Sequence, residues 1–432
     1  TITTNTGTDT VSAGAGNDTV NVDNALTAGD VVAGGDGTDT LAIDALATAA
    51  TAASVSGFEI LRYDTGGLGA QSMANFTANA GFTTIDANHA SLITTSNATS
   101  TVTTLRSTTT GGSHTLTRLI DASTGDTITI EADDSSSASQ GVTTFAAVTA
   151  NDEEIINLVS GSNAAEDLTI TTLTSTDLTT LNLSGTADAV ITAAIANATA
   201  LATVTATGLT GATTVNATNS TVDMTMTAGN GGATFTAGSG DDTITGGTGV
   251  DVLTGGTGAD TISGGAGADT TIDGGAGADT LTGGAGDDNF VMTVTEGVAA
   301  TSMIDNSTGN AIAAGVAVAV GDKIVFANGV DQITDFTAGG TTDDVNTSVS
   351  GEATSGVGVS NSEYGGGSAD LLFLSGSFNT STNTFTVAAD GEGADTLISA
   401  LDQSTSEAIV GTLGHFVLIG VDSDDLVAGD FI

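Results

Sequence analysis

The chain has 432 residues, of which 51 are Asp or Glu and only 4 are Lys or Arg, so its formal net charge is −47. Without a basic patch it is a poor partner for nucleic acid or anionic lipid, and its carboxylates repel one another on folding unless cations are bound. Cys is absent, which excludes disulfides and thiolate metal sites, and 39% of the residues are hydrophobic, which argues against disorder. No apolar run reaches the roughly 18 residues of a membrane-spanning helix, so we expect no membrane insertion.

The chain opens with a degraded nine-residue repeat over residues 1–41. Two pairs of acids are each nine positions apart, within GTDTVSAGAGNDTV and GDVVAGGDGTDTL: Asp9 and Asp18, then Asp30 and Asp39. The residues expected to point inward from short strands are Val11, Val20, Val32 and Leu41. The pattern predicts a short β-roll in which the four Asp side chains bind metal.

Residues 42–236 lose this period but keep weak strand-like segments. The apolar residues in equivalent places of six segments are Leu61, Ile85, Ile120, Ile156, Leu181 and Val204. The alternation of Thr and Ile over residues 127–130 favours a strand, because β-branched side chains suit a pleated surface. We expect an irregular Thr- and Ala-rich β-solenoid, with one helix over the Ala-rich residues 188–200.

A strict repeat of the form GGxGxDxUx fills residues 237–291, in six copies. Its acids lie nine residues apart, apart from one step of ten where Thr271 or a neighbour is inserted: Asp242, Asp251, Asp260, Asp269, Asp279 and Asp288. The residues expected to fill the core are Ile244, Leu253, Ile262, Leu281 and Phe290. The glycines permit tight turns with positive φ, so each copy predicts one turn followed by one short strand.

Two such copies complete one coil, which places Asp242 over Asp260 and Asp251 over Asp269. Carboxylates and turn carbonyls then converge between successive coils. A site built from oxygen ligands suits Ca²⁺ rather than Zn²⁺ or copper. We therefore predict several bound calcium ions.

Residues 292–432 predict a β-rich C-terminal region. The expected strands cover residues 323–326, 371–374, 384–387 and 415–419. A late copy of the repeat, DGEGADTLI, places Asp395 ahead of Leu397 and adds one candidate metal ligand.

The nonapeptide block resembles that of RTX proteins, in which this repeat forms a calcium-binding, right-handed parallel β-roll. The segments ITDFTAGGTTDD at 333–344 and VDSDDLVAGDFI at 421–432 look like the C-terminal secretion region of that family. The resemblance implies an all-β fold, multiple Ca²⁺ ions, export by a type I secretion system and folding on contact with external calcium.

The order GGDGTDTLAID, VSGFEILRY, LTTLNLSGT and LATVTATG is similar to Caulobacter-type surface-layer proteins. This resemblance implies a structural protein that assembles as a homo-oligomeric lattice or filament at the cell surface. We expect any attachment to cell-surface polysaccharide to use a region outside this chain. Acidic clusters at 133–134 and 152–154 are candidates for extra sites or for bridges between copies.

Catalytic motifs are not evident. The triplet Asp64-Thr65-Gly66 matches that of aspartic proteases, but chance explains it in a chain so rich in these residues. His89, His114 and His415 lack the G-x-S-x-G and H-E-x-x-H contexts of hydrolases. We expect no enzymatic activity. The alternatives are an RTX adhesin or glycan-binding module, and an exported hydrolase with an RTX tail.

Overall fold

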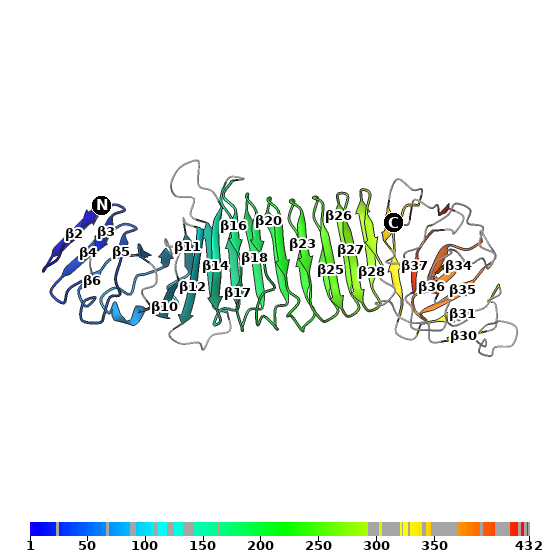
Figure 1. Cartoon of the computed structure of the whole chain (residues 1–432), viewed down its shortest axis with the longest axis horizontal. Coiled ribbons are helices and arrows are strands. Elements are labelled where there is room, and N and C mark those ends of the chain that lie inside the picture. The colour runs from blue at the N-terminus through cyan, green and yellow to red at the C-terminus, as the bar shows by residue number, and fades with distance from the viewer. Residues whose placement is uncertain are drawn as a thin grey trace. The chain divides into compact units, whose positions relative to one another are not determined.

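In the computed structural model the polypeptide coils repeatedly, so that successive strands stack in parallel (Figure 1). The structure describes residues 1–22, 26–65, 69–86, 92–107, 110–118, 125–132, 142–162, 165–292, 302–304, 320–321, 323–326, 329–338, 343–346, 370–388, 392–401, 415–421, 425–426 and 430. The chain divides into two compact units, Thr1–Ser220 and Thr221–Ile432. The boundaries expected at residues 41 and 236 do not coincide with this division.

The first unit has one long sheet in which each strand pairs in parallel with the strand of the next coil. Its strands are β1 (Ile2–Thr3), β3 (Thr19–Val22), β5 (Thr40–Ile43), β7 (Ile60–Tyr63), β9 (Thr84–Asp86), β11 (Thr104–Ser107), β13 (Thr127–Ala132), β15 (Ile155–Val159), β18 (Thr180–Gly185) and β20 (Thr203–Leu209). All of these pairs are parallel, as expected when each coil continues in the same direction as the one before.

Two further parallel sheets complete the coils of the first unit. The larger contains β8 (Ala70–Ser72), β10 (Ile93–Ala98), β12 (Thr110–Arg118), β14 (Thr143–Ala150), β16 (Leu168–Ile170), β17 (Leu173–Thr174), β19 (Ala189–Ile191) and β21 (Thr213–Asn216). The smaller contains β2 (Thr10–Ala15), β4 (Val31–Asp36) and β6 (Val55–Ser56). Among the described residues of the first unit, one short 3₁₀ helix, η1 (Met73–Asn75), interrupts the strands.

Alternation along each strand sets which residues are buried. In β13, Ile128 and Ile130 are buried while the intervening Thr residues are half-buried, as the sequence alternation predicts. Columns of apolar side chains, one from each coil, therefore fill the interior. Leu61 and Ile85 occupy one column, as predicted.

A second column, two residues out of register with the first, holds the other described residues predicted to be equivalent: Ile156, Leu181 and Val204. The columns separate at β13, because Leu105 pairs with Ile130 whereas Ile128 pairs with Ile156. Ile120 lies outside the described residues. The predicted equivalence is thus correct within each group and wrong between them.

The helix expected over residues 188–200 is wrong. Residues 189–191 form β19, and residues 193–200 form a bridge and turns. Ala189, Ile191 and Ile195 are fully buried in the coil interior. Because the apolar face packs against neighbouring coils, packing overrides the helical preference of Ala.

The second unit begins with a regular roll of two parallel sheets. One contains β22 (Thr225–Thr227), β24 (Thr243–Thr245), β26 (Thr261–Ala266), β28 (Thr280–Ala285) and β32 (Asp331–Ile333). The other contains β23 (Ala233–Thr236), β25 (Val252–Thr257), β27 (Thr271–Ala276), β29 (Asn289–Val291) and β33 (Asp344–Asn346). The five predicted core residues, Ile244, Leu253, Ile262, Leu281 and Phe290, are at most 1% exposed.

The register also locates the extra residue of the ten-residue step. Thr271 pairs with Val252, the residue that follows the acid in the preceding coil, so Thr271 holds a regular repeat position. Thr270 is therefore the inserted residue. The roll absorbs it in a bend before β27.

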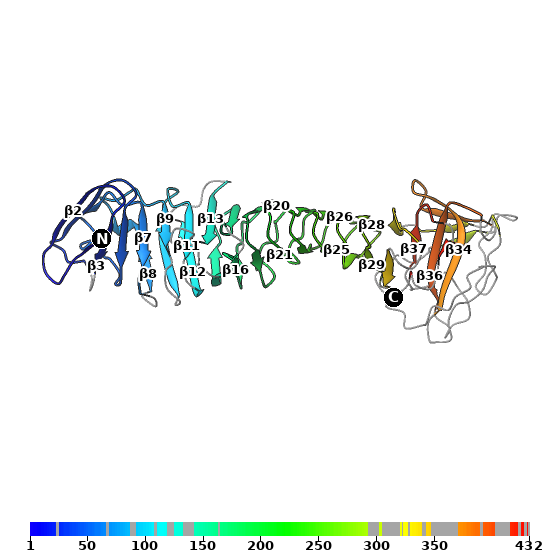
Figure 2. The same cartoon turned by 90° about the horizontal axis from the view of Figure 1, so that it is seen from above.

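The rest of the second unit is an antiparallel sheet, seen beside the roll in Figure 2. In spatial order its strands are β30 (Ser302–Ile304), β31 (Lys323–Val325), β35 (Thr384–Val387), β34 (Asp370–Asn379), β36 (Asp395–Leu401) and β37 (His415–Leu418). The four predicted C-terminal strands are confirmed, with end points that agree within one residue except that β34 extends to Asn379, beyond the predicted end at residue 374. Ile324, Phe326, Phe385 and Val417 are fully buried in its core.

Candidate metal centre

Two rows of aspartates line the roll, one at the start of each sheet's strands. We call Asp242, Asp260 and Asp279 the first row, and Asp251, Asp269 and Asp288 the second row. All six side chains are at most 2% exposed. The predicted stacking of Asp242 over Asp260 and of Asp251 over Asp269 is confirmed, because their strands pair in register.

Each carboxylate uses one oxygen to bind the backbone of the preceding coil. In the first row the N–H of Asp242 donates to Asp260 Oδ1 (2.8 Å), and the N–H of Asp260 donates to Asp279 Oδ1 (2.8 Å). In the second row the N–H of Asp251 donates to Asp269 Oδ1 (2.9 Å), and that of Asp269 donates to Asp288 Oδ1 (3.0 Å). Each row therefore has one Asp per coil, and its carboxylate accepts a hydrogen bond from the backbone N–H of the Asp in the preceding coil.

The second oxygen of most of these carboxylates has no hydrogen-bond partner. It is buried and unpartnered in five of the six residues: Asp242, Asp260, Asp269, Asp279 and Asp288. Asp251 Oδ2 differs, because it accepts the N–H of Gly247 (2.9 Å). A buried carboxylate oxygen without a donor costs several kcal/mol or takes up a cation or a proton, so the site fits a metal ion.

The first glycine of each repeat leaves room for this oxygen. A Cβ built on Gly246 would lie 2.5 Å from Asp251 Oδ2, and the equivalent atom on Gly255 would collide with Asp260 Oδ2. Carbonyl oxygens of the next coil crowd the same glycines, Gly264 O against Gly246 for example. Each repeat therefore brings a carboxylate and main-chain carbonyls together where any side chain would intrude.

Burial raises the pKa of every carboxyl in the two rows. The pKa of Asp260 rises to about 7, and those of Asp269 and Asp279 rise to about 6, mainly through loss of hydration. Repulsion from Asp279 and Asp242 adds to the effect at Asp260. A divalent cation bound beside these carboxyls would lower their pKa values again, because it stabilises the ionised carboxylates.

The donor set determines which cation fits. Among the described residues, no group of three or more His, Cys, Asp or Glu side chains converges on one point. The groups that would hold an ion in the rows are the Asp carboxylates together with the backbone carbonyls that lie beside the same glycines. Hard oxygen ligands of this kind suit Ca²⁺, which takes 6–8 of them in flexible geometry.

The N-terminal acids reproduce part of this arrangement in the first unit. The N–H of Asp9 donates to Asp30 Oδ1 (2.9 Å), and the N–H of Asp18 donates to Asp39 Oδ1 (2.8 Å). Asp39 is fully buried and its Oδ2 has no hydrogen-bond partner. Of the four N-terminal acids, Asp39 therefore resembles the Asp residues of the two rows most closely, because it is buried and has one carboxylate oxygen without a hydrogen-bond partner.

Both carboxylate oxygens of Asp30 accept hydrogen bonds. Oδ1 accepts the N–H of Asp9 and the hydroxyl of Thr27, and Oδ2 accepts the N–H of Thr27. These bonds leave the pKa of Asp30 below its ordinary value even though its burial acts in the opposite direction. Asp9 and Asp18 are only partly buried. The structure therefore brings the four acids together in pairs but places them in unequal environments.

Asp395, the last predicted ligand, does not lie in either row. It begins β36 of the antiparallel sheet, where Oδ2 accepts the N–H of Phe378 (2.7 Å) and Oδ1 accepts the N–H of Gly420 (3.0 Å). Both oxygens thus have backbone partners within that sheet. This geometry gives Asp395 a role in joining strands.

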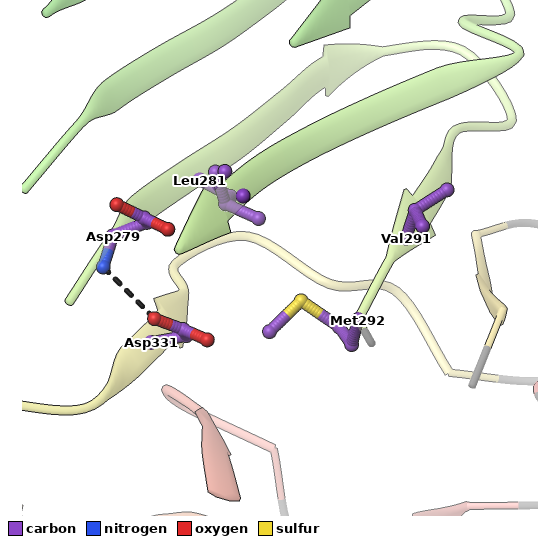
Figure 3. Close-up of a pocket in the computed structure, with 7 residues that line it drawn as sticks. Asp279, Leu281, Val291, Met292 and Asp331 are labelled. Atoms are coloured by element: carbon purple, nitrogen blue, oxygen red, sulfur yellow. Dashed lines mark hydrogen bonds between the residues drawn. The ribbon is translucent and has the colours of Figure 1, made fainter. Parts of the chain in front are cut away.

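Two row members were not predicted from the sequence. Asp331 Oδ1 accepts the N–H of Asp279 (3.0 Å), which extends the first row, and Asp343 Oδ1 accepts the N–H of Asp288 (3.0 Å), which extends the second (Figure 3 shows the first contact). The available signal was the spacing Asp331-Gln332-Ile333, which matches Asp260-Thr261-Ile262. The preceding residues lack the glycine pattern, so the repeat pattern does not identify Asp331.

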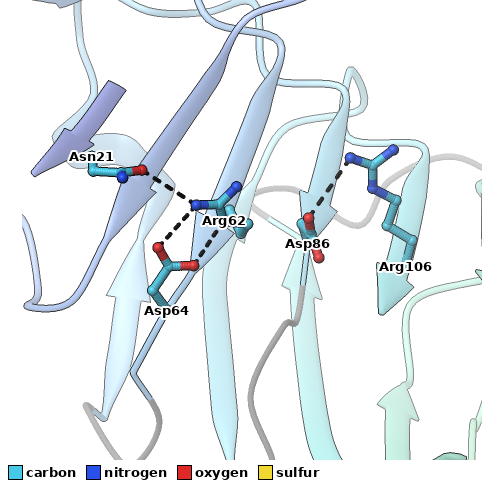
Figure 4. Close-up of polar contacts among 5 residues, drawn as sticks. All are labelled: Asn21, Arg62, Asp64, Asp86 and Arg106. Atoms are coloured by element: carbon cyan, nitrogen blue, oxygen red, sulfur yellow. Dashed lines mark hydrogen bonds and ion pairs between the residues drawn. The ribbon is translucent and has the colours of Figure 1, made fainter. Parts of the chain in front are cut away.

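The first unit also contains a row of alternating opposite charges across three neighbouring strands of its long sheet (Figure 4). Arg62, Asp86 and Arg106 occupy one register position in β7, β9 and β11. Arg62 pairs with Asp64 (2.7 Å), and Arg106 lies 3.7 Å from Asp86. Cations from the chain itself therefore balance carboxylates here.

Comparison with protein-family models agrees with this geometry. A family model described as the RTX calcium-binding nonapeptide repeat (4 copies) matches residues 1–24, 228–270 and 271–291. Among solved structures, the chain is similar to the R3 subunit of a mannuronan C5-epimerase from Azotobacter vinelandii, with a TM-score of 0.23 and 20% identity over 49% of this chain and 78% of that one. No curated protein matches.

The fold and the rows define a parallel β-roll protein whose buried carboxylates take up an oxygen-preferring cation. The matched repeats then give its type: the chain carries RTX calcium-binding nonapeptide repeats, and these repeats bind calcium ions at several sites. The predicted cofactor is confirmed. Proteins with these repeats are typically secreted, and the described residues include no helix with the length and hydrophobicity needed to cross a bilayer.

Proposed function

We propose that this protein is secreted, folds when it meets external calcium and then self-assembles into a surface layer or an extracellular matrix. The observation that supports this proposal best is the set of five buried Oδ2 atoms without partners. In the absence of a cation, folding confines charges that repel one another in a poorly hydrated interior. Folding is therefore tied to a supply of calcium.

Calcium concentration differs between the two sides of a cell envelope, and this difference determines where the chain folds. Modules that work outside cells have dissociation constants of roughly 10⁻⁴–10⁻³ M. An ion that binds only the folded chain stabilises it by RT ln(1 + [Ca²⁺]/Kd) at each site. The chain thus remains unfolded, and competent for type I export, where calcium is scarce.

Assembly follows from charge that the internal sites do not neutralise. With a net charge of −47 the folded copies repel one another, and divalent ions bridging acidic faces remove that repulsion. Asp223 and Asp241 are exposed examples along the roll. The proposed partner is a second copy of this chain, in a lattice or filament.

Calcium titration of the purified chain, followed by circular dichroism and electron microscopy, tests both steps. We expect β structure to appear first and ordered sheets or fibres at higher calcium. Full β structure in excess chelator would contradict the folding step. Dispersed particles at saturating calcium would contradict assembly alone.

One observation favours an adhesin or glycan-binding module as the alternative. Four Thr side chains form a column on the outer face of the roll, at Thr225, Thr243, Thr261 and Thr280. A second column of hydroxyl side chains, three Thr and Ser263, runs beside it, two residues further along the same strands. Regularly spaced hydroxyls on a flat sheet can hydrogen-bond a repetitive polymer, and binding of the monomer to polysaccharide would support this alternative.

A structural role, rather than catalysis, also fits the surroundings of the candidate catalytic groups. His114 is buried, and its burial lowers its pKa to about 3, so it is a poor general base. Asp64 forms an ion pair with Arg62 on the surface, unlike a proton-sharing dyad. His89 lies outside the described residues. A screen for hydrolase activity tests the remaining enzyme alternative.

A further inference from the structure

The two carboxylate rows continue beyond the last nonapeptide, into a segment of the chain that the repeat pattern does not cover. The family match ends at residue 291, whereas Asp331 and Asp343 contact the rows 52 and 55 positions after their partners Asp279 and Asp288. The intervening chain includes β30 and β31 of the antiparallel sheet. The end of the roll is thus built from two distant parts of the sequence.

The chain returns to the roll in register. The N–H of Gln332 donates to Asp279 O (2.8 Å), and the N–H of Thr334 donates to Leu281 O (2.9 Å). On the other side of the coil, the N–H of Asp344 donates to Asp288 O (2.7 Å). The returning segment therefore forms the same contacts with the last nonapeptides that these form with one another.

Asp335 strengthens this connection at the glycine turn. Its two carboxylate oxygens accept the N–H groups of Gly283 (2.9 Å) and Gly284 (2.8 Å). These glycines begin the last nonapeptide, whose acid is Asp288. The turn that would otherwise end the roll is therefore covered by an acidic side chain from the returning segment.

A small cavity lies between Asp279 and Asp331 (Figure 3). Its volume is about 10 Å³, and Gly274, Gly275 and Met292 contribute to its wall. This is about the space that a single water molecule or ion occupies. Asp279 is 1% exposed, and its Oδ2 has no hydrogen-bond partner.

The second row ends in the same way. Asp288 is 2% exposed and its Oδ2 is unpartnered, while Asp343 lies in the next coil and Asp335 lies close enough to raise the pKa of Asp288. Negative charge therefore accumulates at the end of both rows. An ion bound in each place would neutralise it.

We propose that Asp279 with Asp331, and Asp288 with Asp343, form terminal calcium sites, and that the first of these sites fastens the antiparallel sheet to the roll. The connection runs through β32, which pairs with β28 of the roll on one side and with β37 of the antiparallel sheet on the other. Calcium at Asp331 fixes β32, and β32 in turn fixes β37. This coupling does not depend on self-assembly.

The test compares Asp331→Asn and Asp343→Asn with the unmodified full-length chain. Asn retains an oxygen that accepts the N–H of Asp279 or Asp288 but removes the charge that calcium requires. Asp188→Asn is the matched control, because Asp188 Oδ1 accepts the N–H of Ala212 (2.7 Å) in the first unit and Asp188 is not among the residues with buried unpartnered oxygens. Native mass spectrometry counts bound ions, and hydrogen exchange reports each strand.

In the unmodified chain, calcium is expected to slow exchange in β37 as well as in β24 and β26. Asp331→Asn should bind fewer ions and shift the calcium midpoint for protection of β37 upward by about tenfold, leaving the midpoint for β24 unchanged. The Asp188 control should retain both values. Restoration of β37 protection at high calcium distinguishes a weakened site from a misfolded chain.

Two results would overturn the proposal. One is an unchanged ion count and an unchanged β37 midpoint in both variants. The other is a β37 exchange rate in the unmodified chain that is the same in chelator as in calcium. Loss of protection in all strands at every calcium concentration would likewise contradict a site confined to the end of the roll.

Discussion

Asp260 Oδ1 accepts a hydrogen bond from the backbone N–H of Asp242 at 2.8 Å, one coil away, while Asp260 Oδ2 is buried without a partner. One carboxylate thus has two roles. The first oxygen joins coils through a neutral donor, and the second requires a cation. The following predictions depend on this division.

Chelation should unfold the roll of residues 221–291. Each calcium ion bound only to the folded chain contributes about 1.4 kcal/mol when free calcium is ten times the dissociation constant, so five such sites contribute about 7 kcal/mol, which is comparable to the whole stability of a typical domain. We expect excess chelator to remove hydrogen-exchange protection from β24 to β28. Protection that survives in this region would show that the rows fold without metal.

Asp260→Asn should have opposite effects with and without calcium. With calcium, the loss of one charged ligand weakens the site, and a tenfold weaker affinity corresponds to about 1.4 kcal/mol less stability. In chelator, the same change removes a buried charge and should raise the melting temperature of whatever structure remains. Thermal melts in both conditions measure this reversal of sign.

Asp188→Asn provides the control for that experiment, since it also caps a backbone N–H one coil away. The Asp188→Asn substitution should change the melting temperature by the same amount in calcium and in chelator. If Asp260→Asn destabilised the chain by the same amount in both conditions, Asp260 would act through its hydrogen bond alone.

The effect of pH should also reverse with calcium. Burial raises the pKa values of Asp260, Asp269 and Asp279 to about 7, 6 and 6, from an ordinary value of 3.8. At any pH between the ordinary value of 3.8 and these raised values, the folded chain therefore binds more protons than the unfolded chain. Without calcium its stability should therefore be greatest near pH 4 and fall as the pH rises to about 7.

With calcium bound the direction should change, because protons compete with the ion for the same oxygens. Acidification below pH 6 is then expected to release calcium and lower the melting temperature. Melting curves from pH 4 to 8, each with calcium and with chelator, give the two slopes. Slopes of the same sign would contradict the assignment of these carboxyls as ligands.

Gly256→Ala should damage the roll where Gly125→Ala should not. Gly256 has a φ of 116°, and a Cβ there would collide with the carbonyl oxygen of Gly238 on the preceding coil. A Cβ on Gly125 meets no atom within 4 Å, and its φ is not in the left-handed region. We expect a loss of more than about 1 kcal/mol at Gly256 and little change at Gly125, measured by urea unfolding in calcium.

The nonapeptide block shows how much of the site follows from sequence. Asp242 and Asp260 are two repeats apart, and a period of two repeats per coil was enough to stack them and to place Ile244 and Ile262 inside. The alternation in β13 identified its buried face for the same reason. In each case the relevant contacts repeat at a fixed, short sequence separation.

Other features depended on contacts that no local pattern records. Asp395 matches the repeat as well as some true row members, yet its strand pairs antiparallel with β34, so its oxygens bind backbone N–H groups there. The Ala-rich segment around Ala189 became a strand because neighbouring coils bury it. Sequence alone gives no information on which strand lies next to such a segment.

By itself, the sequence determined the nine-residue period and the place of the acid in each repeat, and the resemblance of this pattern to RTX repeats implied a calcium-binding β-roll. The tertiary structure decided where the rows end. Asp331 and Asp343 join Asp279 and Asp288 across 52 and 55 positions, and the antiparallel sheet lies partly within that interval. Pairing across such a distance depends on the shape of the folded sheet, since chain connectivity places almost no restriction on it.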